Sequence, residues 1–180
     1  GKELADQIQN GLAEEIAGLP FVPHLAVLLV GDDPASLLYV NLKKKAGEAL
    51  GMEIDIHHLP AHTSDIQLKA LIENWNTNPD IDGILIQVPL PEGHDENELI
   101  AVMNPQKDVD GFHPINVEAL MKGEPNVISP VHEGVLRLIA QSPARVTESK
   151  VALICNSKIF SNPLERLLSS AGAFVESMSP

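Results

Sequence analysis

The sequence predicts an α/β protein made of two domains with parallel sheets. Segments with helical spacing alternate along the chain with short aliphatic runs, a pattern typical of strand–helix–strand units. The aliphatic runs carry few polar residues, as strands buried on both faces do. Aromatic residues make up only 3% of the chain and hydrophobic residues 44%, so Leu, Ile, Val and Ala must build the core.

The first domain is predicted over residues 1–141, and its first elements are two helices around a buried strand. Apolar residues at helical spacing predict a helix over Glu3–Ala17. The aliphatic run Leu25–Val30 predicts a strand that Gly31 ends. The Asp33-Pro34 pair supplies an N-cap and a first-turn proline for a helix that continues to about Leu50.

The same pattern then repeats. Glu53–Leu59 alternates as a strand, Ser64–Trp75 is a capped helix, and Asp82–Val88 is a second buried strand that two prolines end. Further helices are expected over Glu96–Met103, Val117–Lys122 and Glu133–Gln141, with a turn at Asp108–Gly111. Strands that alternate with helices in this way predict a parallel sheet.

A second domain is predicted over residues 149–180, because residues 142–149 are polar and a new strand begins after them. We expect a strand over Lys150–Ile154, a helix over about Pro163–Ala171 and a strand near Ala173–Glu176. One such unit cannot bury both faces of its sheet, so this domain should be incomplete or should rest on a neighbour.

Composition excludes several classes of partner. The net charge is −13 and the chain has only twelve Lys and Arg residues, which argues against nucleic acid. The single cysteine, Cys155, excludes an internal disulfide, and the sequence shows neither a secretory signal nor an apolar run long enough to cross a membrane. These features predict a soluble protein of a reducing, cytoplasmic compartment.

Two polar side chains could carry chemistry near the end of the first strand. Tyr39 and Lys43 are four residues apart and therefore project from one face of their helix. They follow a strand's carboxyl end, where open α/β sheets place ligands. The alternative is a pair of exposed surface residues, and the run Lys43–Lys45 is equally explained as a solvated helix face.

Other polar residues have competing structural explanations. Gln87 interrupts an aliphatic strand, and a buried amide needs partners, which backbone groups or a ligand could supply. Asp108 and Asp110 precede Gly111 in what reads first as a turn. Three histidines, at positions 57, 58 and 62, could suggest a metal, but no other ligands have convincing spacing.

Four segments, read together, closely resemble the bifunctional methylenetetrahydrofolate dehydrogenase/cyclohydrolase (FolD) family. They are Val30–Ser36, Tyr39–Ala46, Asp82–Pro91 and Asn104–Asn116. Their order and spacing match the family across about residues 1–140. The resemblance implies two α/β domains with a tetrahydrofolate derivative in the cleft between them. It also implies a Rossmann-like second domain that binds NADP, or NAD in some members, and a homodimer formed through that domain.

The resemblance also implies roles for four residues. Lys43 matches the family's catalytic lysine and Tyr39 the tyrosine that stacks on the folate's aminobenzoyl ring. Gln87 matches the glutamine that positions the lysine, and Asp110 the aspartate that holds the pterin. These roles suit the chemistry: a lysine amine with a lowered pKa relays protons while water attacks the methenyl bridge. An amide accepts from that amine without adding a negative charge, and a carboxylate accepts from two pterin N–H groups.

The sequence departs from the family in the cofactor loop. The family's Gly-Arg-Ser segment is Cys155-Asn156-Ser157 here, and the second glycine of the loop is Ser161. Side chains at glycine positions obstruct the approach of a pyrophosphate, and Asn156 lacks the phosphate contact of an arginine. The family's Pro-Cys-Thr-Pro segment is Ser129–His132.

Three functions therefore remain open. The first is the bifunctional enzyme, an oxidoreductase and hydrolase that oxidises methylene-tetrahydrofolate with NADP and hydrolyses methenyl- to formyl-tetrahydrofolate. The second is a cyclohydrolase alone, with cofactor binding lost. The third is a non-catalytic relative that binds folate or serves as a dimerising subunit.

Overall fold

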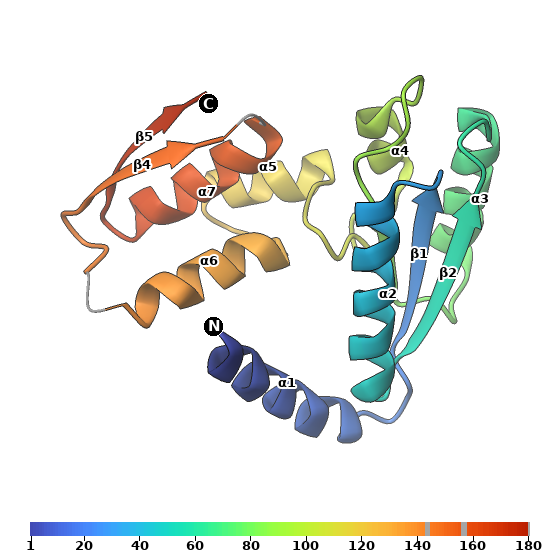
Figure 1. Ribbon diagram of the computed structural model, residues 1–180, viewed down its shortest axis with the longest axis horizontal. Coiled ribbons are helices and arrows are strands. Elements are labelled where there is room, and N and C mark those ends of the chain that lie inside the picture. The colour runs from blue at the N-terminus through green and yellow to red at the C-terminus, as the bar shows by residue number, and fades with distance from the viewer. Residues whose placement is uncertain (143–144, 156–157, 180) are drawn as a thin grey trace. The chain divides into compact units, whose positions relative to one another are not determined.

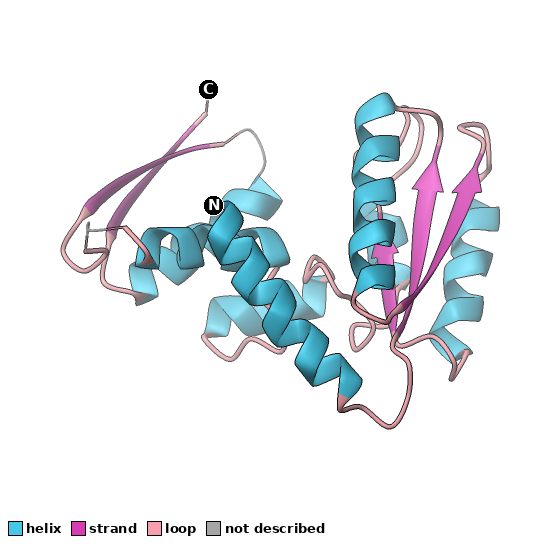
Figure 2. Ribbon diagram, turned by 60° about the horizontal axis from the view of Figure 1, so that its bottom comes forward, coloured by secondary structure: helices cyan, strands magenta, loops and turns pink. Residues whose placement is uncertain are grey.

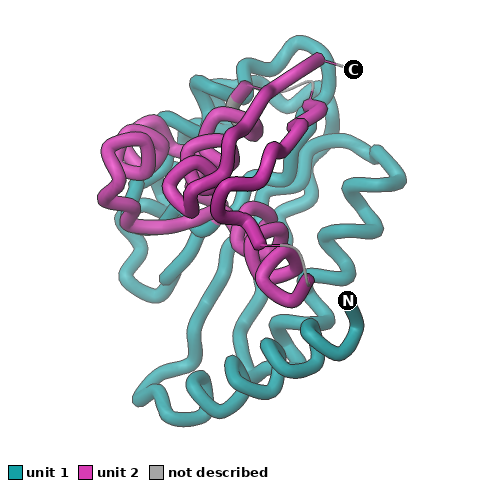
Figure 3. Tube along the Cα trace, turned by 90° about the vertical axis from the view of Figure 1, so that its left-hand side faces the viewer, with its two compact units in different colours: residues 1–109 teal, residues 110–180 magenta. Residues whose placement is uncertain are grey.

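The computed structural model describes residues 1–142, 145–155 and 158–179. They form two compact units, residues 1–109 and residues 110–180, which Figure 3 colours separately. The predicted domain boundary between residues 141 and 149 stays a prediction, because these units are defined by packing alone.

The first unit is a parallel sheet with helices on both faces, as Figures 1 and 2 show. Its strands are β1 (His24–Val30), β2 (Glu53–Leu59) and β3 (Gly83–Ile86), in the order β2-β1-β3. Its helices are α1 (Lys2–Ala17), α2 (Pro34–Ala49), α3 (Asp65–Thr77) and α4 (Glu96–Val102). The predicted α/β architecture with a parallel sheet is confirmed.

Strand β1 lies at the centre of this sheet and pairs with a neighbour on each side. Residues 26–30 are all buried, so the strand is covered on both faces. Val27 and Leu29 pack with Val40 of α2 on one face. The alternate residues point to the other face, on the side of α3, two of whose side chains, Leu68 and Ile72, are fully buried.

Local sequence signals explain where the site-bearing helices begin. The Asp33 carboxylate accepts from the Ser36 backbone N–H at 2.7 Å and caps α2, with Pro34 in its first turn. Ser64 and Gln67 form a capping box at the start of α3. The backbone hydrogen bond from Ser36 lowers the pKa of Asp33 below its usual value.

Lys107 fixes the segment that follows α4. Its ammonium donates to the carbonyls of Trp75 and Asn78 at 2.8 and 2.7 Å, at the C-terminal end of α3. A cation at this position also faces the negative end of the helix dipole. Lys107 therefore serves the packing of the Asn104–Asn116 motif.

The second unit has helices α5 (Pro114–Lys122), α6 (Pro130–Ala140) and α7 (Lys158–Ser170), with parallel strands β4 (Lys150–Ile154) and β5 (Phe174–Met178). Leu164 and Leu168 of α7 form a buried apolar cluster with Ala173. The large side chains of Ile154 and Phe174 remain exposed. In the described residues of this unit, one face of the two-stranded sheet is thus uncovered, as the sequence predicted.

Several predicted boundaries differ from the structure. Helices α5 and α6 each begin three residues before their predicted starts, at Pro114 and Pro130, because proline suits the first helical turn. The prediction that α7 begins at Pro163 is wrong, since the helix starts at Lys158 and contains the proline. Burial of Leu164 and Leu168 on one face explains why the helix tolerates it.

Among the helices that the structure describes, none has the length and apolar character needed to cross a membrane.

Glycine at position 31 allows the ends of two strands to approach each other. Its φ is +77°, and a Cβ atom at this position would lie 2.9 Å from Cγ of Pro91. Its backbone N–H donates to the Leu59 carbonyl at 2.8 Å. Gly31 thus brings the loops after β1, β2 and β3 together.

We predict that Gly31→Ala lowers the free energy of unfolding by about 1–2 kcal/mol, because a side chain here adopts a left-handed backbone conformation and meets Pro91. Gly11→Ala is the matched control: it lies inside α1, and a Cβ atom at this position would have no atom within 4 Å, so the variant should gain roughly 0.5–1 kcal/mol. Urea unfolding of both variants measures the difference, and equal stabilities would contradict this account of Gly31.

Candidate active site

Lys43 and Gln87, predicted as site residues, lie in contact in the first unit. The Lys43 ammonium donates a hydrogen bond to Gln87 Oε1 at 3.0 Å. Lys43 comes from α2, the helix that follows β1, and Gln87 directly follows β3. The pair therefore sits at the carboxyl-terminal edge of the parallel sheet, where such folds place ligands.

The amide of Gln87 is held in one orientation. Gln87 is 9% exposed, and its Nε2 donates to the Val88 carbonyl at 2.7 Å. Its backbone N–H donates to Leu28, which continues the pairing of β3 with β1. With the Nε2 end committed to a carbonyl, the Oε1 end faces Lys43 and can only accept. The amide thus fixes the position of the ammonium.

Tyr39 projects from the same helix one turn before Lys43. Its side chain is 58% exposed, so the ring is accessible to a flat ligand. Lys44 is directed differently, since it pairs with Glu48 at 3.7 Å along the helix. The face of α2 beside Gln87 therefore presents a ring and an ammonium, as the spacing predicted.

A histidine that the sequence analysis did not single out joins two loops near this edge. His94, in the loop between β3 and α4, contacts the Asp65 carboxylate through Nδ1 and the Ala61 carbonyl through Nε2 at 2.9 Å. The hydrogen bond with Asp65 raises the pKa of His94, and the same bond lowers the pKa of Asp65. The partners are 29 residues apart, so no local pattern indicates the pair.

The two aspartates of the turn are placed differently. Asp108 is buried in the first unit, and its backbone forms an isolated parallel β-bridge with Ile84 of β3. Asp110 begins the second unit and is half-buried. Gly111 follows with φ +72°, and a Cβ there would lie 3.3 Å from the Ser129 backbone nitrogen. The role predicted for Asp110 stays a prediction.

The predicted cofactor loop falls in the second unit. Cys155 is half-buried, and its backbone N–H donates to the Met178 carbonyl at 3.0 Å, as part of the β4–β5 pairing. Ser161, at the position of the family's second glycine, is buried within α7. Asn156 and Ser157 lie outside the described residues.

His132 belongs to the segment that departs from the family. It is 1% exposed, its ring packs against Phe160 with centroids 4.6 Å apart, and its Nε2 donates to the Phe160 carbonyl at 2.9 Å. Burial lowers the pKa of His132. This histidine therefore anchors the first turn of α7, which contains the later residues of the predicted cofactor loop.

Two of the three histidines that the sequence analysis weighed as metal ligands have other contacts. His57 packs edge-on against Trp75, with ring centroids 4.9 Å apart. His58 Nε2 lies 2.9 Å from the Gly31 carbonyl and 3.2 Å from the Asp32 carboxylate. His62 is exposed.

The fold and the Lys43–Gln87 pair define a class: an α/β protein with an amine and an amide held together at the carboxyl edge of a parallel sheet. Comparisons with known proteins identify the family. The sequence model of the tetrahydrofolate dehydrogenase/cyclohydrolase catalytic domain matches residues 1–110. The chain belongs to this family.

Curated relatives match nearly the whole chain. The bifunctional protein FolD of Acidiphilium cryptum is 41% identical over 175 residues, which span 97% of this chain and 63% of that protein. FolD of Bacillus pumilus is 39% identical over 178 residues, with the same coverage. The chain thus spans a little less than two thirds of the relatives it matches.

Solved structures agree with the fold. The FolD methylenetetrahydrofolate dehydrogenase/cyclohydrolase of Campylobacter jejuni has a TM-score of 0.93 at 34% identity, over 99% of this chain and 64% of that one. The Trypanosoma brucei enzyme, solved with NADP cofactor and an inhibitor, has a TM-score of 0.94 at 27% identity, over 99% and 63%.

We predict that His94 makes stability depend on pH. The pKa of His94 is raised above its ordinary value of 6.5. Its contribution to the free energy of unfolding is therefore fully present below pH 6.5 and is lost as the pH rises through the raised pKa. The lowered pKa of Asp65 gives a contribution present above 3.8 and lost as pH falls through the lowered value. The excess stability of the wild type over His94→Gln should therefore be largest between pH 3.8 and pH 6.5.

Urea unfolding from about pH 5 to about pH 9 measures this excess, and subtracting the variant cancels contributions from other groups, His132 included. An excess that stays constant across the range would show that His94 is not titrating against Asp65.

Proposed function

We propose that the chain acts in one-carbon folate metabolism and carries the step that hydrolyses methenyl- to formyl-tetrahydrofolate. The observation that carries this proposal is the hydrogen bond from Lys43 Nζ to Gln87 Oε1 at 3.0 Å. It supplies an amine of fixed position, with N–H groups left over for a substrate. Family membership supplies the substrate class.

In the proposed reaction Lys43 moves protons for an attacking water. The water oxygen forms a bond to the methenyl carbon while the neutral amine takes a proton from the water. The ammonium then returns that proton to the departing folate nitrogen as its bond to the carbon breaks. The hydroxyl on the carbon loses the second proton of the water to solvent and becomes the C=O of a formyl group on the other nitrogen, so the reaction releases one proton overall. Gln87 accepts a hydrogen bond from either form of the amine, so it holds Nζ in place throughout.

Tyr39 and Asp110 are proposed as ligand-holding residues. The exposed Tyr39 ring offers a stacking surface for an aromatic part of the folate. The Asp110 carboxylate suits the adjacent N–H donors of a pterin, since one carboxylate can accept from two donors.

Oxidation of methylene-tetrahydrofolate with NADP is the less well supported half of the bifunctional activity. Bound NADP would accept a hydride from the folate. The described loop residues fit it poorly: Cys155 and Ser161 replace glycines, and the Cys155 N–H is used by the Met178 carbonyl. We therefore derive no step through NADP, and a Rossmann-like role for residues 149–180 and a homodimer through them remain proposals.

The same observations favour a second candidate, a cyclohydrolase without dehydrogenase activity. The amine–amide pair of the first unit is intact, whereas the cofactor loop of the second is altered. A non-catalytic folate-binding relative is the third candidate, and loss of turnover with retained folate affinity would select it.

We predict that Lys43→Met lowers the rate of methenyl-tetrahydrofolate hydrolysis at least about a hundredfold, because the proton relay is lost while the apolar stem is kept. Lys122→Met is the matched control, an exposed lysine of α5 paired only along its own helix with Glu118. The decay of methenyl absorbance measures both rates, and circular dichroism confirms folding. An unchanged rate in folded Lys43→Met would exclude this role.

We expect the purified chain to hydrolyse methenyl-tetrahydrofolate and to reduce neither NADP nor NAD with methylene-tetrahydrofolate, because the loop lacks its glycines. Parallel absorbance assays follow the two reactions. Nicotinamide reduction would show that our interpretation of the loop is wrong, and a lack of both activities with retained folate binding would favour the non-catalytic relative.

A further inference from the structure

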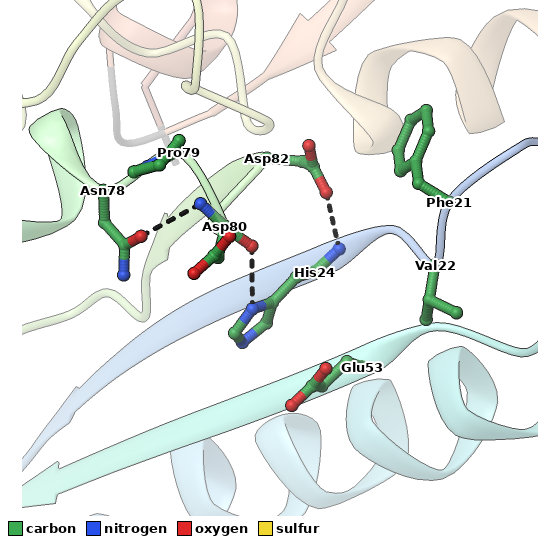
Figure 4. A pocket seen from close by; sticks show the side chains of 8 residues that line it. All are labelled: Phe21, Val22, His24, Glu53, Asn78, Pro79, Asp80 and Asp82. Atoms are coloured by element: carbon green, nitrogen blue, oxygen red, sulfur yellow. Dashed lines mark hydrogen bonds between the residues drawn. The ribbon is translucent and has the colours of Figure 1, made fainter.

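A polar pocket lies at the amino-terminal edge of the three-stranded sheet, where its strands begin. Its volume is about 600 Å³, and its walls are the segment before β1, the start of β2 and the loop between α3 and β3. Figure 4 shows His24 inside it, with Asp80 and Asp82 on one side of the ring and Glu53 on the other. The Lys43–Gln87 pair is at the opposite edge, so this pocket is separate from the proposed folate site.

Strand register brings three ligand-bearing side chains together at this edge of the sheet, two of which, His24 and Glu53, line the pocket. His24 is the ladder partner of Glu53, and Asp55 lies two residues further along β2, so both carboxylates project from one face of the strand. One ligand atom from each of the three lies within 4.8 Å of the others. Within the described residues, this is the one group of His, Cys, Asp and Glu side chains with such spacing.

Hydrogen bonding outside this trio fixes the proton on the His24 ring. Nδ1 lies 2.9 Å from the Asp80 carbonyl, which can only accept, so Nδ1 carries a hydrogen. The lone pair of the neutral ring is then on Nε2, which lies 3.0 Å from Asp55 Oδ2. A histidine that donates one N–H to a backbone carbonyl and presents its other nitrogen is the arrangement found around protein-bound metals.

With the ring neutral, His24 Nε2 and Asp55 Oδ2 are both acceptors, and at 3.0 Å apart they need a cation between them. A proton on Nε2 would satisfy that one contact. It would leave an excess of negative charge, because Glu53, Asp55, Asp80 and Asp82 surround a single imidazolium. Among the described residues that line the pocket there is no lysine or arginine, and nearby Lys107 is bound to the carbonyls of Trp75 and Asn78.

We propose that His24, Glu53 and Asp55 bind a divalent transition-metal ion. One imidazole and two carboxylates suit Zn²⁺, whose bonds to nitrogen and oxygen are about 2.0–2.2 Å, and they disfavour Mg²⁺, which takes oxygen ligands. Both carboxylates are exposed and can rotate inward to close the present spacing. The remaining coordination position faces the pocket, where a water or another donor completes the site.

The bound ion would join the first residues of β1 and β2, which are also connected by backbone pairing and by the His24–Asp55 contact. Binding to the folded state alone raises the unfolding temperature in proportion to the logarithm of metal concentration. This property makes the site measurable without any enzyme assay, and its existence does not depend on the proposed folate activity.

The test is calorimetric titration of the chain with Zn²⁺ alone, followed by the same titration of single variants. We expect one-to-one binding, and affinities at least about tenfold weaker in His24→Gln and in Asp55→Asn. His62→Gln, which removes an exposed histidine beyond the other end of β2, is the matched control and should bind as the wild type does.

Mg²⁺ at the same concentrations should not bind. Absence of Zn²⁺ binding, or binding that His24→Gln leaves unchanged, would overturn the proposal, as would a loss found in Cys155→Ser instead. Circular dichroism of each variant without metal confirms folding. Asp55→Asn replaces an exposed carboxylate by an amide of the same shape that can still hydrogen-bond to His24, so at least one variant tests the site in an intact fold.

Discussion

Burial of β1 on both faces is the constraint on which the rest of the first unit depends. Its residues 26–30 are at most 3% exposed and lie between two neighbouring strands, so no polar side chain is accommodated in this stretch. Burying a polar group without a partner costs several kcal/mol. The polar side chains discussed above therefore lie at the two ends of the sheet.

The two ends solve the problem of charge differently. At the carboxyl edge, the neutral amide of Gln87 accepts a hydrogen bond from the amine of Lys43, an arrangement that suits proton transfer. At the amino edge, one imidazole meets several carboxylates around His24, which suits a cation. Gly31 matters at the first edge because a residue without Cβ lets Pro91 approach, and so brings the loop after Gln87 near the end of β1.

Sequence patterns were informative where a feature is local. The aliphatic run of β1, the Asp33 cap and the four-residue spacing of Tyr39 and Lys43 follow from short segments, and the structure contains them. Contacts between distant segments left no such signal: His94 meets Asp65 across 29 residues, and His24 meets Asp55 across 31. Their pairing is decided by loop geometry and strand register, which composition and spacing do not reveal.

The open geometry of α2 bears on how the proposed hydrolysis is activated. Lys43 and Tyr39 are both exposed, so the free chain does not itself remove water from the amine. A flat methenyl folate stacked on Tyr39 would cover this face, and its positive charge would repel the ammonium. Both effects favour the neutral amine that must accept a proton from water. Gln87 complements this arrangement, because a carboxylate in its place would hold the amine protonated and cancel the effect of the substrate. In the proposed reaction the substrate would thereby complete a site that the fold only positions.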